Sequence, residues 1–307
     1  MTRRPWLLAL LLTFCTAAVA QEVPATQPGE LIKPSTAAGP VEKPEDANKP
    51  LITIQKGDLP IILSAPHGGR KKVPGSAVRT GKNILIKKGV KNTFTMAYDP
   101  NVDVVAQQLA DELEKRTGKR PYVVIANFSR RYVDANRGPT EGAEDAAGQA
   151  VYDEYHGAIQ QFRSEILQKF GQRGLIIDIH GHGRPGESGT IIRGTADWNS
   201  VRHLVEEFGK ESIVGEGGLL GPLNAAGNKF LPACDQLEEK EYPSLNGGYI
   251  TREYGSFAGG NFDAIQFELG GDYRKLPNIP KFVSTLADGF VPFTNKYLLM
   301  TEPVEKK

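Results

Sequence analysis

Four short runs of almost uninterrupted apolar residues recur along the sequence and limit the folds that it can form. They are LPIILSA, PYVVIAN, GLIIDIH and DAIQFEL, at residues 59–65, 121–127, 174–180 and 263–269. Such runs are typical of β-strands that are covered on both faces, because a half-exposed strand alternates apolar and polar residues. The sequence therefore predicts a sheet with a layer of structure on each side.

Helical patterns separate these runs. Asp99 and Pro100 predict an N-cap and a first helical residue, and the apolar spacing that follows continues until Gly118. Three more helices are expected: over 146–170, from Asn199, and from about Lys281 to an interruption at Pro292. Strands that alternate with helices form mainly parallel sheets, so the sequence predicts an α/β protein with its sheet between helices.

The first fifty residues have the composition of targeting and linker segments. Residues 1–20 combine two arginines, an apolar stretch and an Ala-Val-Ala pattern, which predicts a secretory signal peptide that is too short to span a membrane. Cys15 would be acylated in a lipoprotein, but the bulky Phe14 precedes it. Residues 21–50 are Pro-rich without apolar periodicity, which predicts a disordered linker. We therefore expect an exported protein, periplasmic or secreted, with a single domain at 51–307.

Charge and cysteine content limit the partners and the disulfides that we expect of the exported domain. Removal of residues 1–20 takes away two of the 37 basic residues and none of the 36 acidic ones, which leaves a formal charge of −1. This balance does not indicate a nucleic-acid partner or an anionic membrane surface. Without Cys15, only Cys234 remains, so no intrachain disulfide is expected and the thiol is predicted to be buried.

Polar residues capable of chemistry follow each of the four predicted strands. They are His67 after the first strand, the run SRRYVDANR (129–137) after the second, Asp178, His180 and His182 at the third, and Gln266 and Glu268 at the fourth. Ligands of α/β proteins bind at the carboxyl ends of parallel strands. The sequence therefore predicts one clustered site rather than scattered surface polarity.

Asp178 and His180 lie two residues apart, so an extended chain places them on the same side. The carboxylate would then orient the imidazole by accepting its second N–H, as is common at zinc sites, although a purely structural Asp–His pair is the alternative. His182 has the same spacing but is flanked by glycines, so it would contact substrate, metal or neither.

Glu268 is a charged residue in an otherwise apolar run. A buried carboxylate needs a partner, so Glu268 is a candidate general base or metal ligand, with an ion pair to Arg274 as the structural alternative. The sequence has no G-x-S-x-G elbow, phosphate-binding loop or dinucleotide fingerprint. Histidines from different strand ends together with carboxylates favour a zinc hydrolase, in which the metal activates a bound water.

Five motifs in order along the chain resemble those of the N-formylglutamate amidohydrolases. They are SAPHGG, SRRYVDANR, DIHGHG, GGYITREYG and AIQFEL, all between Ile61 and Arg274. That family is similar in architecture to the zinc carboxypeptidases and the acylamino-acid deacylases. The resemblance therefore implies a three-layer α/β/α sandwich around a mainly parallel, mixed sheet.

The resemblance also implies roles for individual residues. His67 and His180 would bind one zinc ion, and Glu268 would be the catalytic glutamate. Arg131 would be a second catalytic residue, as a further anion-binding or oxyanion-stabilising group. Further motif residues are expected to contact the substrate, with Asn136 and Arg137 holding its carboxylate: Arg130, Asn136, Arg137, His182, Tyr249 and Gln266.

The third metal ligand is less well defined by the sequence. Zinc carboxypeptidases take it from a glutamate three positions after the first histidine, where this chain has Arg70. We assign the missing carboxylate to Asp99, at the start of the first predicted helix, with Asp103 as the alternative.

The functional hypothesis is an exported zinc amidohydrolase that cleaves an amide bond of an N-acyl amino acid. Because N-formylglutamate belongs to cytosolic histidine breakdown, an exported enzyme would act on another N-acyl amino acid, a γ-glutamyl polymer or a cell-wall peptide. A metallo-peptidase with the same catalytic residues is therefore an alternative. A non-catalytic protein that binds a carboxylated ligand on the same fold is the second alternative, which Arg70 favours.

Overall fold

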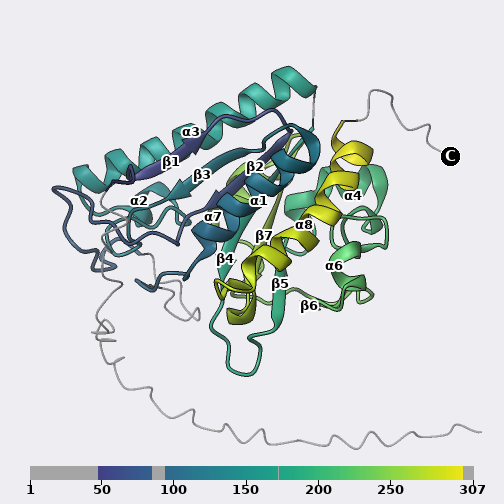
Figure 1. Cartoon of the computed structure of the whole chain (residues 1–307). Coiled ribbons are helices and arrows are strands. Elements are labelled where there is room, and N and C mark those ends of the chain that lie inside the picture. Colours follow the sequence, from purple (N-terminus) through teal and green to yellow (C-terminus); the bar gives the residue numbers. More distant parts are fainter. Residues whose placement is uncertain (1–47, 85–93, 172, 300–307) are drawn as a thin grey trace, which may run out of the picture. The chain divides into compact units, whose positions relative to one another are not determined.

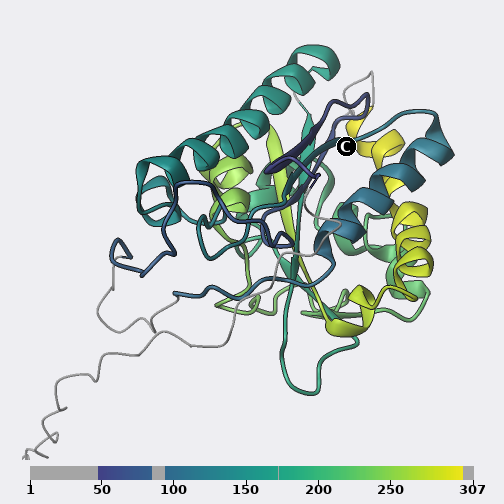
Figure 2. The ribbon, with the colours of Figure 1, turned by 60° about the vertical axis from the view of Figure 1, so that its left-hand side comes forward.

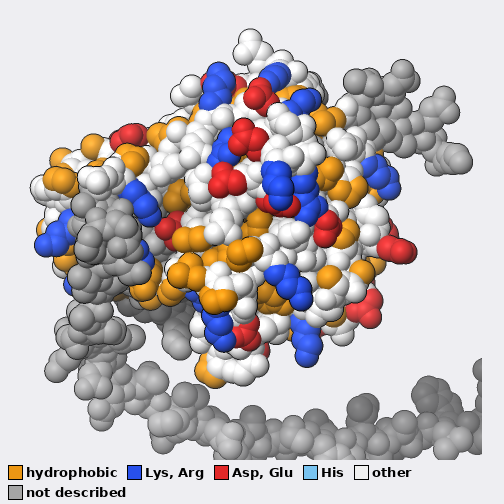
Figure 3. Space-filling model, viewed as in Figure 1, with side chains coloured by type: hydrophobic (Ala, Val, Ile, Leu, Met, Phe, Trp, Pro, Cys, Tyr) orange, Lys and Arg blue, Asp and Glu red, His pale blue; other side chains and the backbone are white. Residues whose placement is uncertain are grey.

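The computed structural model describes residues 48–84, 94–171 and 173–299, all of which belong to a compact unit that spans Ala37–Lys307. The predicted signal peptide and almost all of the predicted linker lie outside the described residues. None of the described helices has the length and apolar character needed to cross a membrane. On the face shown in Figure 3, Lys and Arg side chains are interspersed with Asp and Glu side chains.

The described residues form seven strands in one sheet. The strands are β1 (Ile52–Gln55), β2 (Ile61–Ala65), β3 (Tyr122–Ala126), β4 (Gly174–Gly181), β5 (Thr190–Gly194), β6 (Lys229–Leu231) and β7 (Phe262–Leu269). Their order across the sheet is β1-β3-β2-β4-β7-β5-β6 (Figure 1). The central strands β3, β2, β4 and β7 are parallel, whereas β1 and β5 pair antiparallel with β3 and β7. The four predicted strands are thus the parallel centre of a mixed sheet.

Eight α-helices lie in the described part of the chain. They are α1 (Val102–Thr117), α2 (Pro139–Gly142), α3 (Ala146–Phe170), α4 (Arg202–Phe208), α5 (Glu211–Val214), α6 (Gly221–Ala225), α7 (Tyr249–Tyr254) and α8 (Ile279–Phe293). Short 3₁₀ turns occur at Asn199–Val201, Ser256–Ala258 and Gly271–Arg274, and a π-helical turn, Thr294–Leu298, follows α8.

The helices cover both faces of the sheet. In Figure 2, α3 lies on one side of the sheet and α1 and α8 lie on the other. Alternate strand residues enter two separate cores: Ile177 and Ile265 pack with α1 and α8, whereas Ile176 and Ala264 pack with α3 and α7. The predicted three-layer α/β/α fold is therefore confirmed, and the double burial explains why the central strands are apolar throughout.

The boundaries of two helices differ from the prediction. Asp99 is not the cap of α1, which begins at Val102 after Asn101 in a left-handed conformation. The Asp99 carboxylate is instead directed toward two histidines, and its backbone N–H donates to the His67 carbonyl. Pro292 does not interrupt α8, because it lies in the last turn, where the helix continues to Phe293. The predicted ends at Gly118 and Phe170 match the structure.

Candidate metal centre

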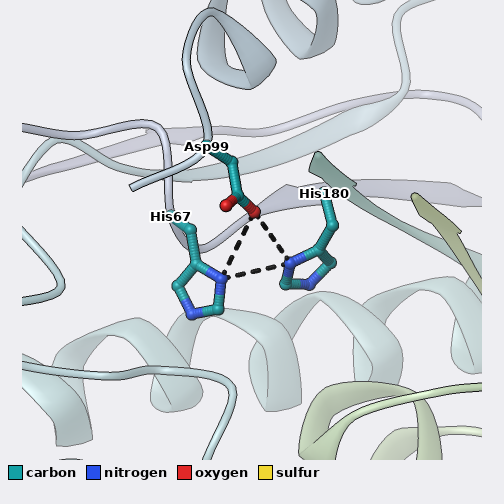
Figure 4. Close-up of side chains that lie close together, drawn as sticks. All are labelled: His67, Asp99 and His180. Atoms are coloured by element: carbon teal, nitrogen blue, oxygen red, sulfur yellow. Dashed lines mark hydrogen bonds and ion pairs between the residues drawn. The ribbon is translucent and has the colours of Figure 1, made fainter. Parts of the chain in front are cut away.

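His67, Asp99 and His180 meet at the carboxyl end of the sheet (Figure 4). His67 follows β2, Asp99 lies in the loop before α1, and His180 is in β4. The two Nδ1 atoms are 3.1 Å apart, and Asp99 Oδ2 lies 3.6 Å from His67 Nδ1 and 3.3 Å from His180 Nδ1. All three side chains are buried. Three segments far apart in the sequence therefore direct one atom each toward a common point.

Backbone contacts hold these residues in place. The Asp99 N–H donates to the His67 carbonyl over 2.9 Å, and the Gly181 N–H donates to Asp99 Oδ2 over 3.1 Å. Gly69 packs directly on the backbone of Asn127, at the end of β3, so a side chain there would collide with main-chain atoms. Gly69, two residues after His67, thus permits close backbone contact, which fixes the turn that carries the histidine.

The second nitrogen of each imidazole faces a carboxylate. His67 Nε2 lies 2.7 Å from Asp134 Oδ1, and His180 Nε2 lies 2.9 Å from Asp178 Oδ2. Because a carboxylate accepts hydrogen bonds, both Nε2 atoms carry the proton, and this tautomer is assigned from the hydrogen-bond network. The two Nδ1 lone pairs then point toward each other and toward the Asp99 carboxylate, an arrangement that requires a positive charge between them.

A zinc ion fits this arrangement. Ligand atoms of a tetrahedral zinc site with bonds near 2.0–2.1 Å lie about 3.3–3.5 Å apart, close to the observed separations of 3.1, 3.3 and 3.6 Å. Burial alone would lower the pKa of His180, but Asp178 and Asp99 outweigh it and hold that pKa well above its usual value. A proton therefore supplies the positive charge when no metal is bound.

Asp178 makes the predicted contact with His180 and is itself held from the other side. Its Oδ1 accepts a hydrogen bond from Ser64 Oγ over 2.8 Å, and Ser64 Oγ lies 2.9 Å from the Tyr155 hydroxyl of α3. All of these groups are buried. The network fixes the direction of the imidazole, and a serine within an apolar strand was the sequence signal for it.

Asp134 performs the same role for His67 and was not assigned a role from the sequence. Its Oδ2 accepts a hydrogen bond from Arg130 Nε over 2.8 Å and lies 3.5 Å from Arg79 Nη2. Burial would raise the pKa of Asp134, but Arg130 and His67 hold it well below its usual range. Its position as the lone acidic residue among the arginines of SRRYVDANR was the sequence feature that could have identified it.

Glu268 and Gln266 lie beside the cluster on the neighbouring strand. The register of β4 and β7 pairs His180 with Glu268 and Asp178 with Gln266, so all four side chains share one face of the sheet. Burial raises the pKa of Glu268 to about 7, against the opposing effect of His180. Gln266 Nε2 donates to Glu268 Oε1 over 2.8 Å.

Asn136 joins this group to the start of α7. Its Oδ1 accepts a hydrogen bond from the Ile250 N–H over 2.9 Å, and its Nδ2 lies 3.0 Å from His180 Nε2 and 3.4 Å from Gln266 Oε1. The Tyr249 side chain packs against the His156 ring with a centroid distance of 5.5 Å. The backbone of the motif GGYITREYG thus contacts this group, through the Gly248 N–H at Gln266 and the Ile250 N–H at Asn136.

The arginines after β3 surround Asp134. Arg137 Nε lies 3.9 Å from Asp134 Oδ2, on the same oxygen that Arg130 contacts. Arg131 shows no such contact with Asp134; its carbonyl accepts from the Arg79 N–H, and its Nε is buried. The guanidinium groups of Arg79, Arg130 and Arg137 thus all lie within 3.9 Å of the same Asp134 oxygen.

Two expected site residues are not brought to the cluster. His182 Nε2 lies 3.2 Å from the Thr190 carbonyl, and its Nδ1 accepts a long hydrogen bond from the Arg184 N–H. Asp103 lies on the first turn of α1, where its carboxylate is 3.9 Å from Lys49 Nζ. Among the described residues, the carboxylate that joins the two histidines belongs to Asp99.

The chain is similar to solved structures of amide hydrolases. The N-formylglutamate amidohydrolase of Ralstonia eutropha JMP134 has a TM-score of 0.50 and 14% identity, covering 80% of this chain and 98% of that chain. A bacteriophage poly-gamma-glutamate hydrolase has a TM-score of 0.36 and 10% identity, with 80% and 89% coverage. The N-acetylmuramoyl-L-alanine amidase AmiC2 of Nostoc punctiforme has a TM-score of 0.33 and 10% identity, with 78% and 97% coverage.

Sequence comparisons add no relatives to this set. No protein-family model matches the chain, and no curated protein matches it. At 14% identity the similarity to the Ralstonia enzyme concerns architecture rather than individual residues. The seven-stranded mixed sheet with helices on both faces thus has the fold of an N-formylglutamate amidohydrolase.

Proposed function

We propose that the protein is an exported zinc amidohydrolase that cleaves an amide bond of an N-acyl amino acid. The observation that carries the proposal is the meeting of His67 Nδ1, His180 Nδ1 and Asp99 Oδ2, next to the buried Glu268. The shared fold with an N-formylglutamate amidohydrolase supports the amide-hydrolase part. The signal-peptide pattern of residues 1–20 supports export.

His67, His180 and Asp99 would hold the metal. Asp134 and Asp178 keep the two imidazoles in the tautomer that presents Nδ1 to it. A zinc ion with three protein ligands supplies a Lewis acid and a water of lowered pKa. The arrangement of donors, two neutral imidazoles and one carboxylate, is one that zinc favours.

Glu268 is the candidate general base. A base works best when its pKa lies near the operating pH, and burial raises the pKa of Glu268 to about 7. Its carboxylate would take a proton from the attacking water and return it to the leaving amine. The register of β4 and β7 pairs Glu268 with His180, one of the proposed metal ligands, on the same face of the sheet.

The arginines around Asp134 are the candidate substrate anchors. Arg130 and Arg137 share one Asp134 oxygen, and their guanidinium groups are partly exposed, so a substrate carboxylate could approach them. Arg131 remains a candidate for stabilising the oxyanion. Anchoring the substrate carboxylate here would hold the scissile amide near the metal ligands, because Asp134 also contacts His67.

The test combines metal analysis with one substitution. The purified protein is expected to bind one zinc ion and to hydrolyse members of a panel of N-acyl amino acids, N-acyl glutamates and γ-glutamyl peptides. Glu268→Gln is expected to keep the zinc and to lose about 10²- to 10⁴-fold in kcat, the usual contribution of a general base. Glu165→Gln, at a partly exposed position on α3 where the carboxylate pairs with Lys56, is the matched control and is expected to retain full activity.

Absence of stoichiometric zinc, or full activity of Glu268→Gln, would contradict the proposed mechanism. Activity confined to γ-glutamyl or cell-wall peptides would keep the mechanism and change the substrate class. Zinc-independent binding of a carboxylated ligand without turnover of any panel member would favour a non-catalytic binding protein.

A further inference from the structure

Gln266 uses both ends of its amide within the protein. Its Oε1 accepts a hydrogen bond from the Gly248 N–H over 2.7 Å and a longer one from Asn136 Nδ2 over 3.4 Å. Its Nε2 donates to Glu268 Oε1 over 2.8 Å. The side chain is 3% exposed. A residue in this state is poorly suited to the substrate-binding role that its motif implied.

The orientation of this amide is determined by its neighbours. The Gly248 N–H can only donate, so the group that faces it must be the amide oxygen. A flipped Gln266 would place two donors together at Gly248 and two acceptors together at Glu268. The NH₂ group of Gln266 is therefore committed to the Glu268 carboxylate.

Gly248 allows α7 to approach this closely. A Cβ atom on Gly248 would collide with the side-chain amide of Asn136. Asn136 in turn accepts the Ile250 N–H, so the two amide side chains and the first turn of α7 form one connected unit. The backbone of α7 thereby determines where Gln266 points.

The Glu268 carboxylate, which accepts this hydrogen bond, is the candidate general base of the proposed reaction. Glu268 is 6% exposed, so little water surrounds it to orient its side chain. With Oε1 held by Gln266, Oε2 is the oxygen left for proton transfer. A misplacement of about 1 Å in such a group can lower a rate about 100-fold.

We propose that Gln266 is a positioning residue that holds the Glu268 carboxylate in its working orientation, with the Gly248 N–H as its anchor. The inference rests on the proposed function for the role of Glu268, but the contact itself can be tested without activity. The start of α7 would then contribute to catalysis by holding Gln266 in place, and would not need to contact the substrate.

The first experiment is the nearly isosteric Gln266→Met substitution, which keeps side-chain length and removes both hydrogen-bonding ends. The expected result is a fall in kcat of about 10- to 100-fold, with KM and zinc content unchanged. Gln161→Met is the matched control, because Gln161 Nε2 donates to Glu165 Oε1 over 3.0 Å on the exposed face of α3. The control is expected to retain kcat and KM.

Two outcomes would overturn the inference. A rise in KM at constant kcat would show that Gln266 contacts the substrate. An unchanged kcat would show that Gln266 only packs against its neighbours and does not position the Glu268 carboxylate.

A double-mutant cycle between Gln266→Met and Glu268→Met separates this inference from the proposed function. Thermal unfolding of the zinc-loaded and metal-free protein is expected to show that the two substitutions are not additive, since each removes the same hydrogen bond. The Gln161 and Glu165 pair is expected to be close to additive, because Gln161 is exposed and Glu165 keeps its ion pair with Lys56 when Gln161 is replaced. Additivity at 266 and 268 would refute the contact, whereas coupling in a protein without amidase activity would refute only the proposed function.

Discussion

Replacement of Asp99 by Ala tests the metal site most directly, because the sequence left Asp99 and Asp103 as alternatives and the structure separates them. Asp99 Oδ2 lies within 3.6 Å of both histidine Nδ1 atoms, whereas Asp103 lies on α1 near Lys49. Asp99→Ala removes one of the three proposed donor atoms. This donor is the carboxylate oxygen, which carries a negative charge. Asp103→Ala makes the same chemical change four residues later and is the matched control.

The loss of zinc affinity expected for Asp99→Ala can be estimated from the role of Asp99 as a proposed ligand. Loss of a residue that merely orients a ligand costs about 10- to 100-fold in metal affinity, so loss of a ligand should cost at least about 100-fold. At a zinc concentration of 1,000 times the dissociation constant, binding stabilises the folded protein by about 4.1 kcal/mol, which a 100-fold weaker site reduces to about 1.4 kcal/mol. The difference of about 2.7 kcal/mol corresponds to about 5–11 °C in Tm for a domain of this size.

The measurement is the zinc-induced shift in Tm, together with zinc affinity from competition with a chelator. The shift is preferable to the absolute Tm, because Asp99→Ala also removes the hydrogen bond from the Gly181 N–H, which costs about 1 kcal/mol without metal. Asp103→Ala is expected to keep the wild-type shift. Wild-type zinc affinity in Asp99→Ala, or its loss in Asp103→Ala, would refute the assignment of the third ligand.

Two further predictions concern protonation and the core. Because Asp178 and Asp99 hold the pKa of His180 well above its usual value, zinc must displace a proton, so apparent affinity should rise about tenfold per pH unit up to that raised pKa. Titration calorimetry in buffers of different ionisation enthalpy would detect the released proton, and its absence at neutral pH would contradict the prediction. Glu241→Gln should destabilise the protein by about 3–5 kcal/mol in denaturant unfolding, since it leaves the buried Arg193 without its charged partner. A loss below about 1 kcal/mol would contradict this.

The sequence predicted the centre of the sheet better than its edges, for a physical reason. β2, β3, β4 and β7 are covered by helices on both faces, so burial required long apolar runs that are visible in the sequence. β1 and β6 lie at the edges of the sheet, and β6 has only three residues. Such strands depend on pairing with a neighbour rather than on a pattern of their own.

The candidate site was predictable where strand periodicity determines position. The two-residue spacing placed Asp178 and His180 on one face, and the same rule places Gln266 with Glu268. Asp134 was harder to assign, because its contact with His67 depends on the path of a loop. Gln266 was expected to bind substrate, and only the backbone of α7 reveals that its amide is already engaged.

The path of the chain after His67 explains why Arg70 does not occupy a ligand position. Gly69 packs on the backbone of Asn127, and the Lys71 N–H donates to the Asn127 carbonyl over 2.9 Å, so this segment runs along the end of β3. A helical turn after His67, which would bring the side chain three residues later back toward the proposed metal site, is incompatible with these contacts. The loop before α1 contacts the turn at His67 directly, where the Asp99 N–H donates to the His67 carbonyl. The proposed third ligand is therefore the carboxylate that this loop supplies, and a glutamate introduced at position 70 is not expected to replace it.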